Sequence, residues 1–521
     1  MKKVKFILIF FSFMLNELNA QPDIQWEKSY GGINYDYGRM IIQTTDNNYA
    51  VIGYSFSGDG DVTGSHGSAD IWISKLDSSG TIIWQKALGG TKREEGFSII
   101  QTNDNHYLIA GQSRSNDGDV AGNHSSPSWN DIWIVKLDSM GILNWQKCLG
   151  GSNDDGAYSI IQTRDGKYMV AGTVWSNNGD VTNNYGKNDY WIIKLDTNGT
   201  IIWQKNYGGS ENDAANTIIE TSDGGYLITG ASNSVDIDVT GNHGNADFWV
   251  IKLDSGGVLQ WQKSLGGSSD EWGKAVIETT DGQFIVVGTT SSDNGDVSGN
   301  HGSLDYWVVK LEASGNIVWQ KTLGGSSDDE GYSIIPSSNG GYIVAGFSCS
   351  NDGDIISNNG AADYWIVNLD SSGIIQWQKN YGGTLEDKCY SISSLSYGQA
   401  ALAGESWSDD GNITNHYDLN DYWIVKLNTL TGIKEITAPE AFLIYPNPAS
   451  AYINIDRTNN SGYKQINIYS ASGQKLFTFE SDVEKIKIDI SKLSSGIYFI
   501  TITDKYGRLW FKKTIKNSQQ F

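Results

Sequence analysis

The chain has 521 residues, of which 19 are tryptophan and 61 are glycine, and its formal net charge is −23. This length suits one large repeat domain together with a small second domain. Both ends of the chain are net positive, so the middle is more acidic than the total; this disfavours nucleic acid and anionic membranes as partners and favours cations or uncharged ligands such as sugars.

Residues 1–20 are expected to be a secretory signal peptide. Lys2, Lys3 and Lys5 give a charged start, residues 6–15 form an apolar run, and Ala20 is a small residue at the expected cleavage point. An N-terminal membrane anchor is the alternative, but the apolar run is too short to cross a bilayer comfortably. No later stretch is long and apolar enough for a membrane-spanning helix, so no transmembrane segment is predicted.

A repeat of 58 residues, once extended to 61, fills the middle of the chain. A Trp followed by Gln-Lys or Glu-Lys and then by Gly-Gly occurs seven times, at Trp26, Trp84, Trp145, Trp203, Trp261, Trp319 and Trp377. A second Trp, two residues after an Asp, occurs at Trp72, Trp133, Trp191, Trp249, Trp307, Trp365 and Trp423. The simplest interpretation of both sets is core packing.

Each unit holds four short runs rich in Ile, Val, Tyr and Trp and bounded by turn residues. In the second unit these runs are 96–102, 106–111, 131–138 and 142–147. Such runs predict β-strands, and four strands per unit predict propeller blades. The expected fold is therefore all-β, with a seven-bladed β-propeller over residues 21–428. We expect the Ser-Ile-Ile-Gln-Thr strand to be innermost and the Trp-Gln-Lys strand to be outermost.

The ends of the repeat region are expected to meet. The first Trp strand precedes the first complete blade, and the seventh blade has only three strands of its own. Pairing of residues 24–30 with residues 421–427 would complete the last blade and remove free sheet edges.

One stretch shows a family resemblance. Residues 261–271 read Trp-Gln-Lys-Ser-Leu-Gly-Gly-Ser-Ser-Asp-Glu, and the same form recurs in each unit. In this respect residues 24–428 resemble bacterial secreted β-propeller repeats of the Trp, Gly-Gly and acidic type. The resemblance implies the propeller fold and indicates no particular activity.

Alignment of the seven units gives three acidic columns, all expected in or beside loops on one face of the ring. The first column contains Asp36, Glu94, Asp155, Asp213, Glu271, Asp329 and Asp387. The second contains Asp61, Asp119, Asp180, Asp238, Asp296 and Asp354, with Asn412 in the seventh unit. The third contains Asp70, Asp131, Asp189, Asp247, Asp305, Asp363 and Asp421.

Two interpretations of these columns stay open. Asp and Asn side chains accept backbone N–H bonds in turns and at strand entries, so the columns can be structural. Ca²⁺ prefers several carboxylate and carbonyl oxygens, so the six Asp residues of the second column are candidate calcium ligands. No other cofactor is predicted.

Histidine and cysteine give no further site. The histidines of the long loop are expected to be surface residues, because a ring spreads them too far apart for zinc; they are His66, His124, His243 and His301. The three cysteines are odd in number and match no metal motif, so they are expected to be buried or half-buried; they are Cys148, Cys349 and Cys389.

Four tryptophans fall outside the regular sets of the propeller. Trp129, Trp175, Trp272 and Trp407 all lie in or beside the long loops, where the units differ from one another. An aromatic face there can stack on a sugar ring or anchor a protein partner. Local loop packing is the alternative.

The pattern changes near the C-terminus, where residues 429–442 are expected to be a linker and residues 443–521 a small antiparallel β-sandwich. Four ordered motifs occupy residues 445–448, 466–475, 493–500 and 512–515. They make residues 443–516 similar to the type A sorting domain of type IX secretion cargo. The motif residues are Tyr445, Pro446, Asn447, Pro448, Gly473, Gly496 and Tyr498.

The sorting-domain resemblance implies passage across the outer membrane by the type IX machinery, then removal of the domain and release or anchoring at the cell surface. A carbohydrate-binding module of similar size is the alternative, but the segment lacks an aromatic cluster for sugars.

The sequence favours a secreted or cell-surface binding or adhesion protein, monomeric, whose loop face binds a glycan or a protein. A polysaccharide hydrolase or lyase is one alternative. Its only support is Glu220 and Glu278, which replace Gln at an inner-strand position, and no Gly-x-Ser-x-Gly, His-Glu-x-x-His or phosphate-loop motif is present. A structural surface protein is the other alternative.

Overall fold

A computed structural model describes residues 21–125, 128–337, 340–428 and 430, and, nearer the C-terminus, residues 442–446, 449–457, 463–470, 475–479, 485–504 and 509–516. The predicted signal peptide and most of the predicted linker lie outside these residues. The chain divides into two compact units, Met1–Gly432 and Ile433–Phe521, and each is described by itself. Within the described ranges, no helix is long and apolar enough to cross a membrane.

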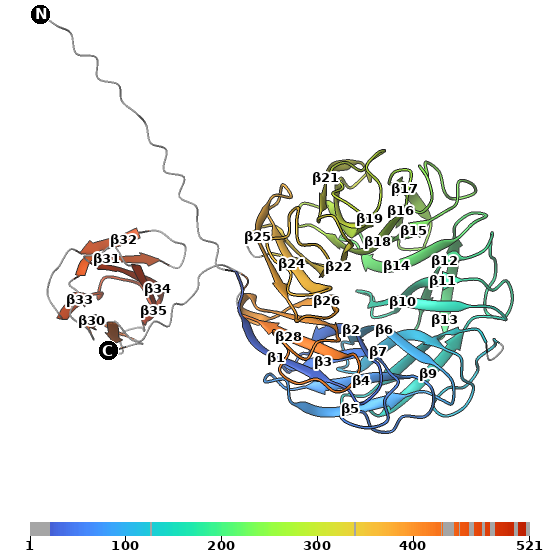
Figure 1. The fold of residues 1–521 in the computed structure, drawn as a ribbon, viewed down its shortest axis with the longest axis horizontal. Coiled ribbons are helices and arrows are strands. Elements are labelled where there is room, and N and C mark those ends of the chain that lie inside the picture. The colour runs from blue at the N-terminus through green and yellow to red at the C-terminus, as the bar shows by residue number, and fades with distance from the viewer. Residues whose placement is uncertain are drawn as a thin grey trace, which may run out of the picture. The chain divides into compact units, whose positions relative to one another are not determined.

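The first unit is a seven-bladed β-propeller, as the repeats predict (Figure 1). Every blade is a four-stranded antiparallel sheet. Blades 1 to 3 contain β2 (Asp36–Gln43), β3 (Tyr49–Ser55), β4 (Asp70–Leu76) and β5 (Ile82–Leu88); β6 (Glu94–Gln101), β7 (Tyr107–Ser113), β8 (Asp131–Leu137) and β9 (Leu143–Leu149); and β10 (Asp155–Gln162), β11 (Tyr168–Val174), β12 (Asp189–Leu195) and β13 (Ile201–Tyr207).

Blades 4 to 6 contain β14 (Asp213–Glu220), β15 (Tyr226–Ser232), β16 (Asp247–Leu253) and β17 (Leu259–Leu265); β18 (Glu271–Glu278), β19 (Phe284–Thr290), β20 (Asp305–Leu311) and β21 (Ile317–Leu323); and β22 (Asp329–Pro336), β23 (Tyr342–Ser348), β24 (Asp363–Leu369) and β25 (Ile375–Tyr381). Blade 7 combines β26 (Asp387–Ser394), the 3-10 turn η1 (Ser396–Gly398), β27 (Ala400–Ser406) and β28 (Asp421–Leu427) with β1 (Ile24–Tyr30).

The first strand of each blade contacts the first strands of both neighbouring blades, so it is innermost, as predicted (Figure 1).

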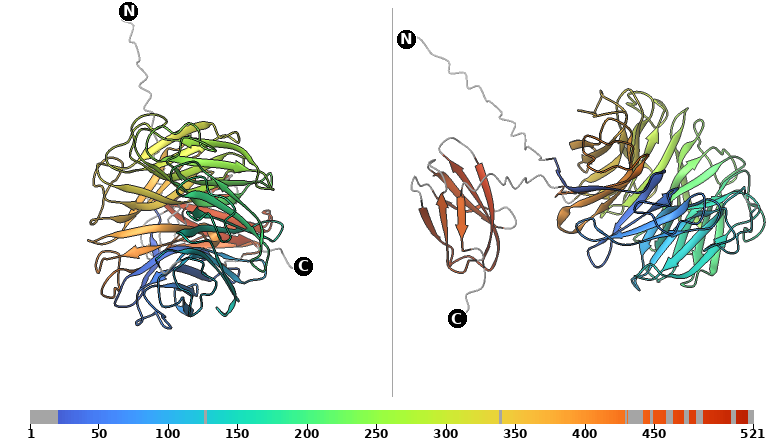
Figure 2. Two further views of the ribbon diagram at one scale, coloured as in Figure 1. Left: turned by 90° about the vertical axis from the view of Figure 1, so that its right-hand side faces the viewer. Right: turned by 60° about the horizontal axis from the view of Figure 1, so that its bottom comes forward.

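The ring closes through β1, which pairs antiparallel with β28 (Figure 2, right). Trp26 lies opposite Lys426, and Tyr30 lies opposite Tyr422. The predicted contact between the two ends of the repeat region is therefore confirmed, and the free edge of the last blade is covered.

The Glu of Trp-Glu-Lys in the first unit accepts the same side-chain bond as the Gln of Trp-Gln-Lys in the other units. In blades 1 to 6 the buried Trp donates its indole N–H to the Gln of the outer strand at 2.7–2.9 Å. In blade 7 the acceptor is the Glu27 carboxylate, which receives the Trp423 N–H at 2.9 Å. The motif thus joins the third strand of a blade to its fourth.

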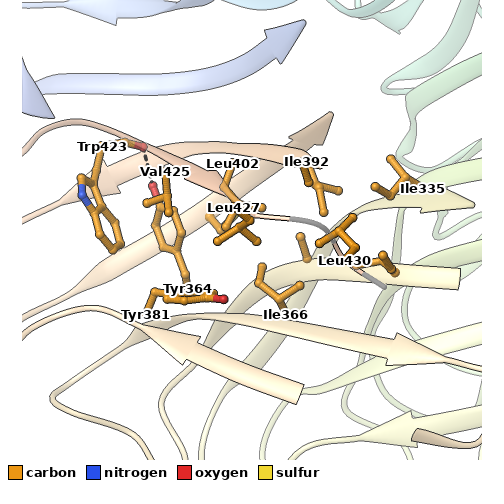
Figure 3. Close-up of a cluster of buried hydrophobic side chains, with 14 of the residues drawn as sticks. Ile335, Tyr364, Ile366, Tyr381, Ile392, Leu402, Trp423, Val425, Leu427 and Leu430 are labelled. Atoms are coloured by element: carbon orange, nitrogen blue, oxygen red, sulfur yellow. Dashed lines mark hydrogen bonds between the residues drawn. The ribbon is translucent and has the colours of Figure 1, made fainter. Parts of the chain in front are cut away.

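The hydrophobic core lies between neighbouring blades. The second set of tryptophans, Trp72 to Trp423, is fully buried. Figure 3 shows the cluster between blades 6 and 7, where Tyr364 and Ile366 of β24 pack against Trp423 and Val425 of β28. The Tyr364 hydroxyl also donates to the Trp423 carbonyl at 2.8 Å. Buried aromatic side chains of this size dominate core energetics, so the packing role predicted for this set is confirmed.

The first set of tryptophans covers the outer edge of the blades. Most of these rings are half-buried, and each of the first six packs against the tight turn of the next blade. The Trp84 ring, for example, lies against Gly141, whose φ of 79° suits glycine.

The second unit is a β-sandwich, as predicted. One sheet contains β29 (Phe442–Tyr445), β30 (Tyr452–Arg457) and β33 (Lys485–Asp489); the other contains β32 (Lys475–Phe479), β31 (Tyr463–Ser470), β34 (Gly496–Asp504) and β35 (Leu509–Lys516). Buried isoleucines from both sheets meet between them, including Ile453, Ile455, Ile466, Ile468 and Ile500. This apolar layer holds the two sheets face to face.

Candidate binding site at the axis of the propeller

The first acidic column fixes the entry into the inner strands. In blade 4 the buried Asp213 accepts the Gly209 N–H at 2.7 Å and the Ser234 hydroxyl at 2.8 Å. The second glycine of Gly-Gly donates to this column in all seven blades, at 2.7–2.8 Å. The column therefore joins two loops of each blade, which is the structural role that turn acids commonly have.

The second column, which supplies the predicted calcium ligands, ties the long loop to the first glycine. The Asp119 N–H donates to the Gly89 carbonyl at 2.8 Å, and its carboxylate accepts the Gly89 N–H at 3.3 Å. The same two bonds recur at Asp61, Asp180, Asp238, Asp296, Asp354 and Asn412.

The arrangement of side chains bears on whether the second column binds a metal ion. In the part of the chain that the structure describes, no group of three or more His, Cys, Asp or Glu residues is arranged to hold a metal ion. Hydrogen bonds alone account for the second column, and the calcium site stays a prediction.

The third column places a second buried carboxylate beside the first at each blade junction. Asp189 Oδ2 accepts the Tyr185 N–H at 2.7 Å, while its Oδ1 has no hydrogen-bond partner among the described residues. Gly208 lies between the two acids: a β-carbon there would be 2.5 Å from Asp189 Oδ1 and 2.6 Å from Asp213 Oδ2. Burial, together with the Asp213 charge, raises the pKa of Asp189 to about 7.

The loop histidines contact this third column and do not converge. Their Nδ1 atoms lie 2.8–3.2 Å from an Asp Oδ2, at His66, His124, His243 and His301. Each side chain is partly exposed. The three cysteines are free, with Cys148 and Cys389 buried and Cys349 half-buried.

Glu220 and Glu278 perform the same task as the Gln residues that they replace. Glu220 accepts the Arg164 N–H at 2.9 Å, and Glu278 accepts the Ser222 N–H at 2.7 Å. In other blades Gln43, Gln101 and Gln162 receive the matching backbone N–H of the adjacent blade. The column thus links neighbouring blades at the end of the propeller opposite the long loops.

A different set of residues lines the axis. Each inner strand has a register shift at its fourth residue, and the side chain at this β-bulge is half-buried in every blade. A bulge re-aims its side chain and leaves it outside the ladder. We call these seven residues the axial ring: Arg39, Phe97, Tyr158, Asn216, Lys274, Tyr332 and Tyr390.

Arg39 lies among aromatic rings. Its guanidinium is 4.3 Å from the centroid of Tyr390 and 5.4 Å from that of Tyr54, and Nη2 donates to the Tyr54 hydroxyl at 3.0 Å. The Tyr390 hydroxyl donates to Glu405 at 3.0 Å. Burial raises the pKa of Glu405, although the Arg39 charge opposes this rise.

Lys274, in blade 5, has a similar environment three blades away around the ring. Its ammonium lies 5.3 Å from the Tyr332 centroid and 5.5 Å from that of Trp272, within the range of cation–π attraction. The Tyr332 hydroxyl donates to Glu330 at 3.0 Å, and the Tyr332 and Tyr390 rings are 5.0 Å apart. Lys274, Tyr332, Tyr390 and Arg39 therefore form a continuous arc over blades 5, 6, 7 and 1.

The four predicted tryptophans lie in three places at the long-loop end of the axis. Trp129 and Trp175 meet edge to face at 5.4 Å. Trp407 packs against Tyr35 at 5.6 Å, and Trp272 stands beside Lys274. Trp129, Trp175 and Trp272 are each 39–41 % exposed, so part of each ring is available to a ligand.

The axial ring was not foreseen from the sequence. Its residues stand three positions after the first acidic column in every unit, and their variation was visible there. The β-bulge that turns them toward the axis cannot be inferred from spacing alone.

The sorting motif is described in part. The structure covers Tyr445, Pro446, Gly496 and Tyr498, whereas Asn447, Pro448 and Gly473 lie outside the described residues. The Tyr445 hydroxyl donates to Asp456 at 2.7 Å, and the Tyr498 hydroxyl donates to the Ser494 carbonyl at 2.8 Å. Both contacts lie within the second unit.

Comparison with known families identifies the second unit. Residues 443–517 match the family model described as secretion system C-terminal sorting domain. The chain therefore carries a type IX sorting domain and is exported to the cell surface or the medium.

The propeller has more distant relatives. Regulatory protein FlaEY of Caulobacter vibrioides is 23 % identical over 354 residues, which cover 61 % of this chain and 36 % of that protein. The chain thus spans about a third of the length of this curated relative. The WD40 domain of Neurospora crassa Pan2 is 11 % identical with a TM-score of 0.44, covering 80 % of this chain and 100 % of that domain. Sqt1 from Chaetomium thermophilum is 14 % identical with a TM-score of 0.40, covering 76 % and 87 %.

Fold and sorting domain together define the class: an exported β-propeller that is cargo of type IX secretion.

Proposed function

We propose that this exported propeller binds a glycan at the long-loop end of its axis. One observation carries the proposal. The residues that repeat in every blade serve backbone hydrogen bonds and packing, whereas the residues that differ between blades gather around the axis. Ligand sites are typically lined by aromatic side chains with a few well-placed polar groups, and this end of the axis has both.

The aromatic groups favour a sugar. Trp175 and Trp272 present half-exposed rings beside charged or polar side chains, and such amphipathic surfaces suit ligands with an apolar face and many hydroxyls. A protein is the alternative ligand, and the experiment below distinguishes it from a glycan.

A glycan array probed with the purified chain, with Ca²⁺ and again with EDTA, tests the proposal. Binding in both conditions supports glycan recognition and assigns the second acidic column to structure. Binding lost in EDTA supports glycan recognition and the calcium site together. Absence of glycan binding in both conditions contradicts the proposal and directs the search to a protein partner at the cell surface.

Replacing the exposed Trp175 together with the half-buried Trp407 gives a sharper test. Trp175→Ala combined with Trp407→Ala is expected to weaken glycan binding about tenfold or more, because stacking area is lost. The melting temperature is expected to change little. Ile202→Ala, an exposed position on the outer strand β13, is the control and is expected to bind normally. Loss of folding in the double variant would make these residues core and remove their support for a binding role.

A further inference from the structure

The axial ring contains two cations, Arg39 and Lys274, that form no ion pair with any residue that the structure describes. We infer that Arg39 and Lys274 together bind the carboxylate of an acidic sugar, such as a uronic acid residue of a glycan. The inference rests on the proposed function and names its ligand class.

The Arg39 guanidinium is incompletely satisfied. In the described part of the chain it makes one hydrogen bond, to the Tyr54 hydroxyl, and no ion pair. Its Nε is buried and has no hydrogen-bond partner there. A buried N–H of a charged group without an acceptor is costly, and guanidinium N–H groups match carboxylate oxygens well.

Lys274 is a second cation of this kind. Its ammonium makes no ion pair or hydrogen bond with any described residue and lies near the rings of Trp272 and Tyr332. Burial lowers the pKa of Lys274; the Glu330 charge opposes this effect, and the Arg39 charge adds to it. The two cations stand at the ends of one arc of rings, through Tyr390 and Tyr332, and like charges on such an arc repel each other. A carboxylate between them would relieve that repulsion and replace lost hydration.

The nearby acids do not already fill this role. Glu405 and Glu330 receive hydroxyl hydrogen bonds from Tyr390 and Tyr332, respectively. Among the described residues, neither acid lies within ion-pair distance of Arg39 or Lys274. They balance part of the charge, so the ring attracts an anion without being strongly cationic overall.

The surroundings favour a carboxylate on a sugar ring over a small free anion. The half-buried Tyr37 stacks at 4.8 Å on the buried Tyr54 beside Arg39, and the half-exposed Trp272 stands beside Lys274. Aromatic faces next to both cations can contact the pyranose while the cations hold its carboxylate. Phe97, Tyr158 and Asn216 are uncharged, so the remaining blades add no competing charge to the ring.

The test compares acidic oligosaccharides with their carboxyl-reduced counterparts, by calorimetric titration of the full exported chain. Oligogalacturonate and glucuronate-containing oligosaccharides are the probes. We expect the wild-type chain to bind an acidic probe about tenfold or more tightly than its reduced form. Arg39→Gln and Lys274→Met are each expected to remove most of this preference, whereas Arg39→Lys is expected to retain part of it. Lys205→Met, an exposed position on β13, is the matched control and should leave the preference intact.

The outcomes separate the two proposals. Equal binding of acidic and reduced sugars by the wild type overturns the carboxylate site and leaves glycan binding standing. Preserved preference in folded Arg39→Gln and Lys274→Met variants overturns the assignment of these two residues. No binding of any sugar by the wild type contradicts the proposed function itself. Melting curves of each variant confirm that it is folded, and the Arg39→Lys result keeps the test valid if Arg39→Gln does not fold.

Discussion

The blade junctions and the axial ring follow opposite rules. At the junctions the same Gly-Gly pair and nearly the same acids recur in all seven blades, with the same hydrogen bonds at almost the same lengths. At the axial ring the blades carry Arg, Lys, Asn, Phe and three Tyr residues at one structural position. Backbone geometry therefore determines the residue types at the blade junctions, whereas it does not determine the residue types of the axial ring.

The physical reason lies in what each side chain does for the backbone. A junction acid accepts N–H groups that would otherwise be buried without a partner, so any blade that lost it would carry that penalty. A bulge residue lies outside the ladder, so no strand pairing depends on its identity. Variation at the bulge is tolerated by the fold, and this makes the axial ring the place where a specific function can be built.

The largest expected effect on stability comes from replacing a Trp by Ala between two blades, compared with the same replacement beside the axial ring. Trp249→Ala removes a fully buried ring between blades 3 and 4 and is expected to lower the free energy of unfolding by about 3–5 kcal/mol. Trp272→Ala removes a 41 % exposed ring and is expected to cost less than about 1 kcal/mol. Chemical denaturation of both variants checks this. Equal losses would show that Trp272 is core and that the two regions do not differ as described.

The contrast between repeated and varied positions also explains which features could be predicted from the sequence. Repeated features were predictable because a pattern that occurs in seven units is easy to tell from a chance feature of one unit. The blade count, the strand order and the closure by residues 24–30 all follow from the repeats. Trp129 and Trp175 were foreseen as loop aromatics, but their contact at 5.4 Å was not. Arg39 and Lys274 were missed because only bulges in strands that are far apart in the chain place them on the same axial ring.

A moderate effect is expected at the glycine between the paired carboxylates. Gly208→Ala would place a β-carbon 2.5–2.6 Å from two buried acid oxygens, so the acids must shift away from their donors. We expect a loss of about 1–3 kcal/mol in the free energy of unfolding. Gly256→Ala is the control, because its nearest contact would be an ordinary 3.4 Å and its turn is exposed. A neutral result at Gly208 would mean that the junction is looser than these distances indicate.

The smallest expected effect is a gradual dependence of stability on pH. Burial raises the pKa of Asp36, Asp189 and Asp363 to about 7 from an ordinary value of 3.8, and a neighbouring acid adds to each rise. A group whose folded pKa is raised contributes stability that is complete below the unfolded pKa and is lost as pH rises through the folded pKa. The melting temperature of the propeller should therefore fall by a few degrees as pH rises from about 4 to above 7.

Asp189→Asn separates this cause from general charge repulsion. The amide keeps an oxygen that can accept the Tyr185 N–H but removes one of the two carboxylates flanking Gly208. We expect the variant to lose less stability than the wild type between pH 5 and pH 8, because the amide removes the raised-pKa group and cannot become charged beside Asp213. Asp196→Asn, at an exposed turn where hydrogen bonds hold the pKa below its ordinary value, is the control. An identical pH profile in Asp189→Asn and wild type would place the pH dependence outside the junctions and leave the paired acids as hydrogen-bond acceptors only.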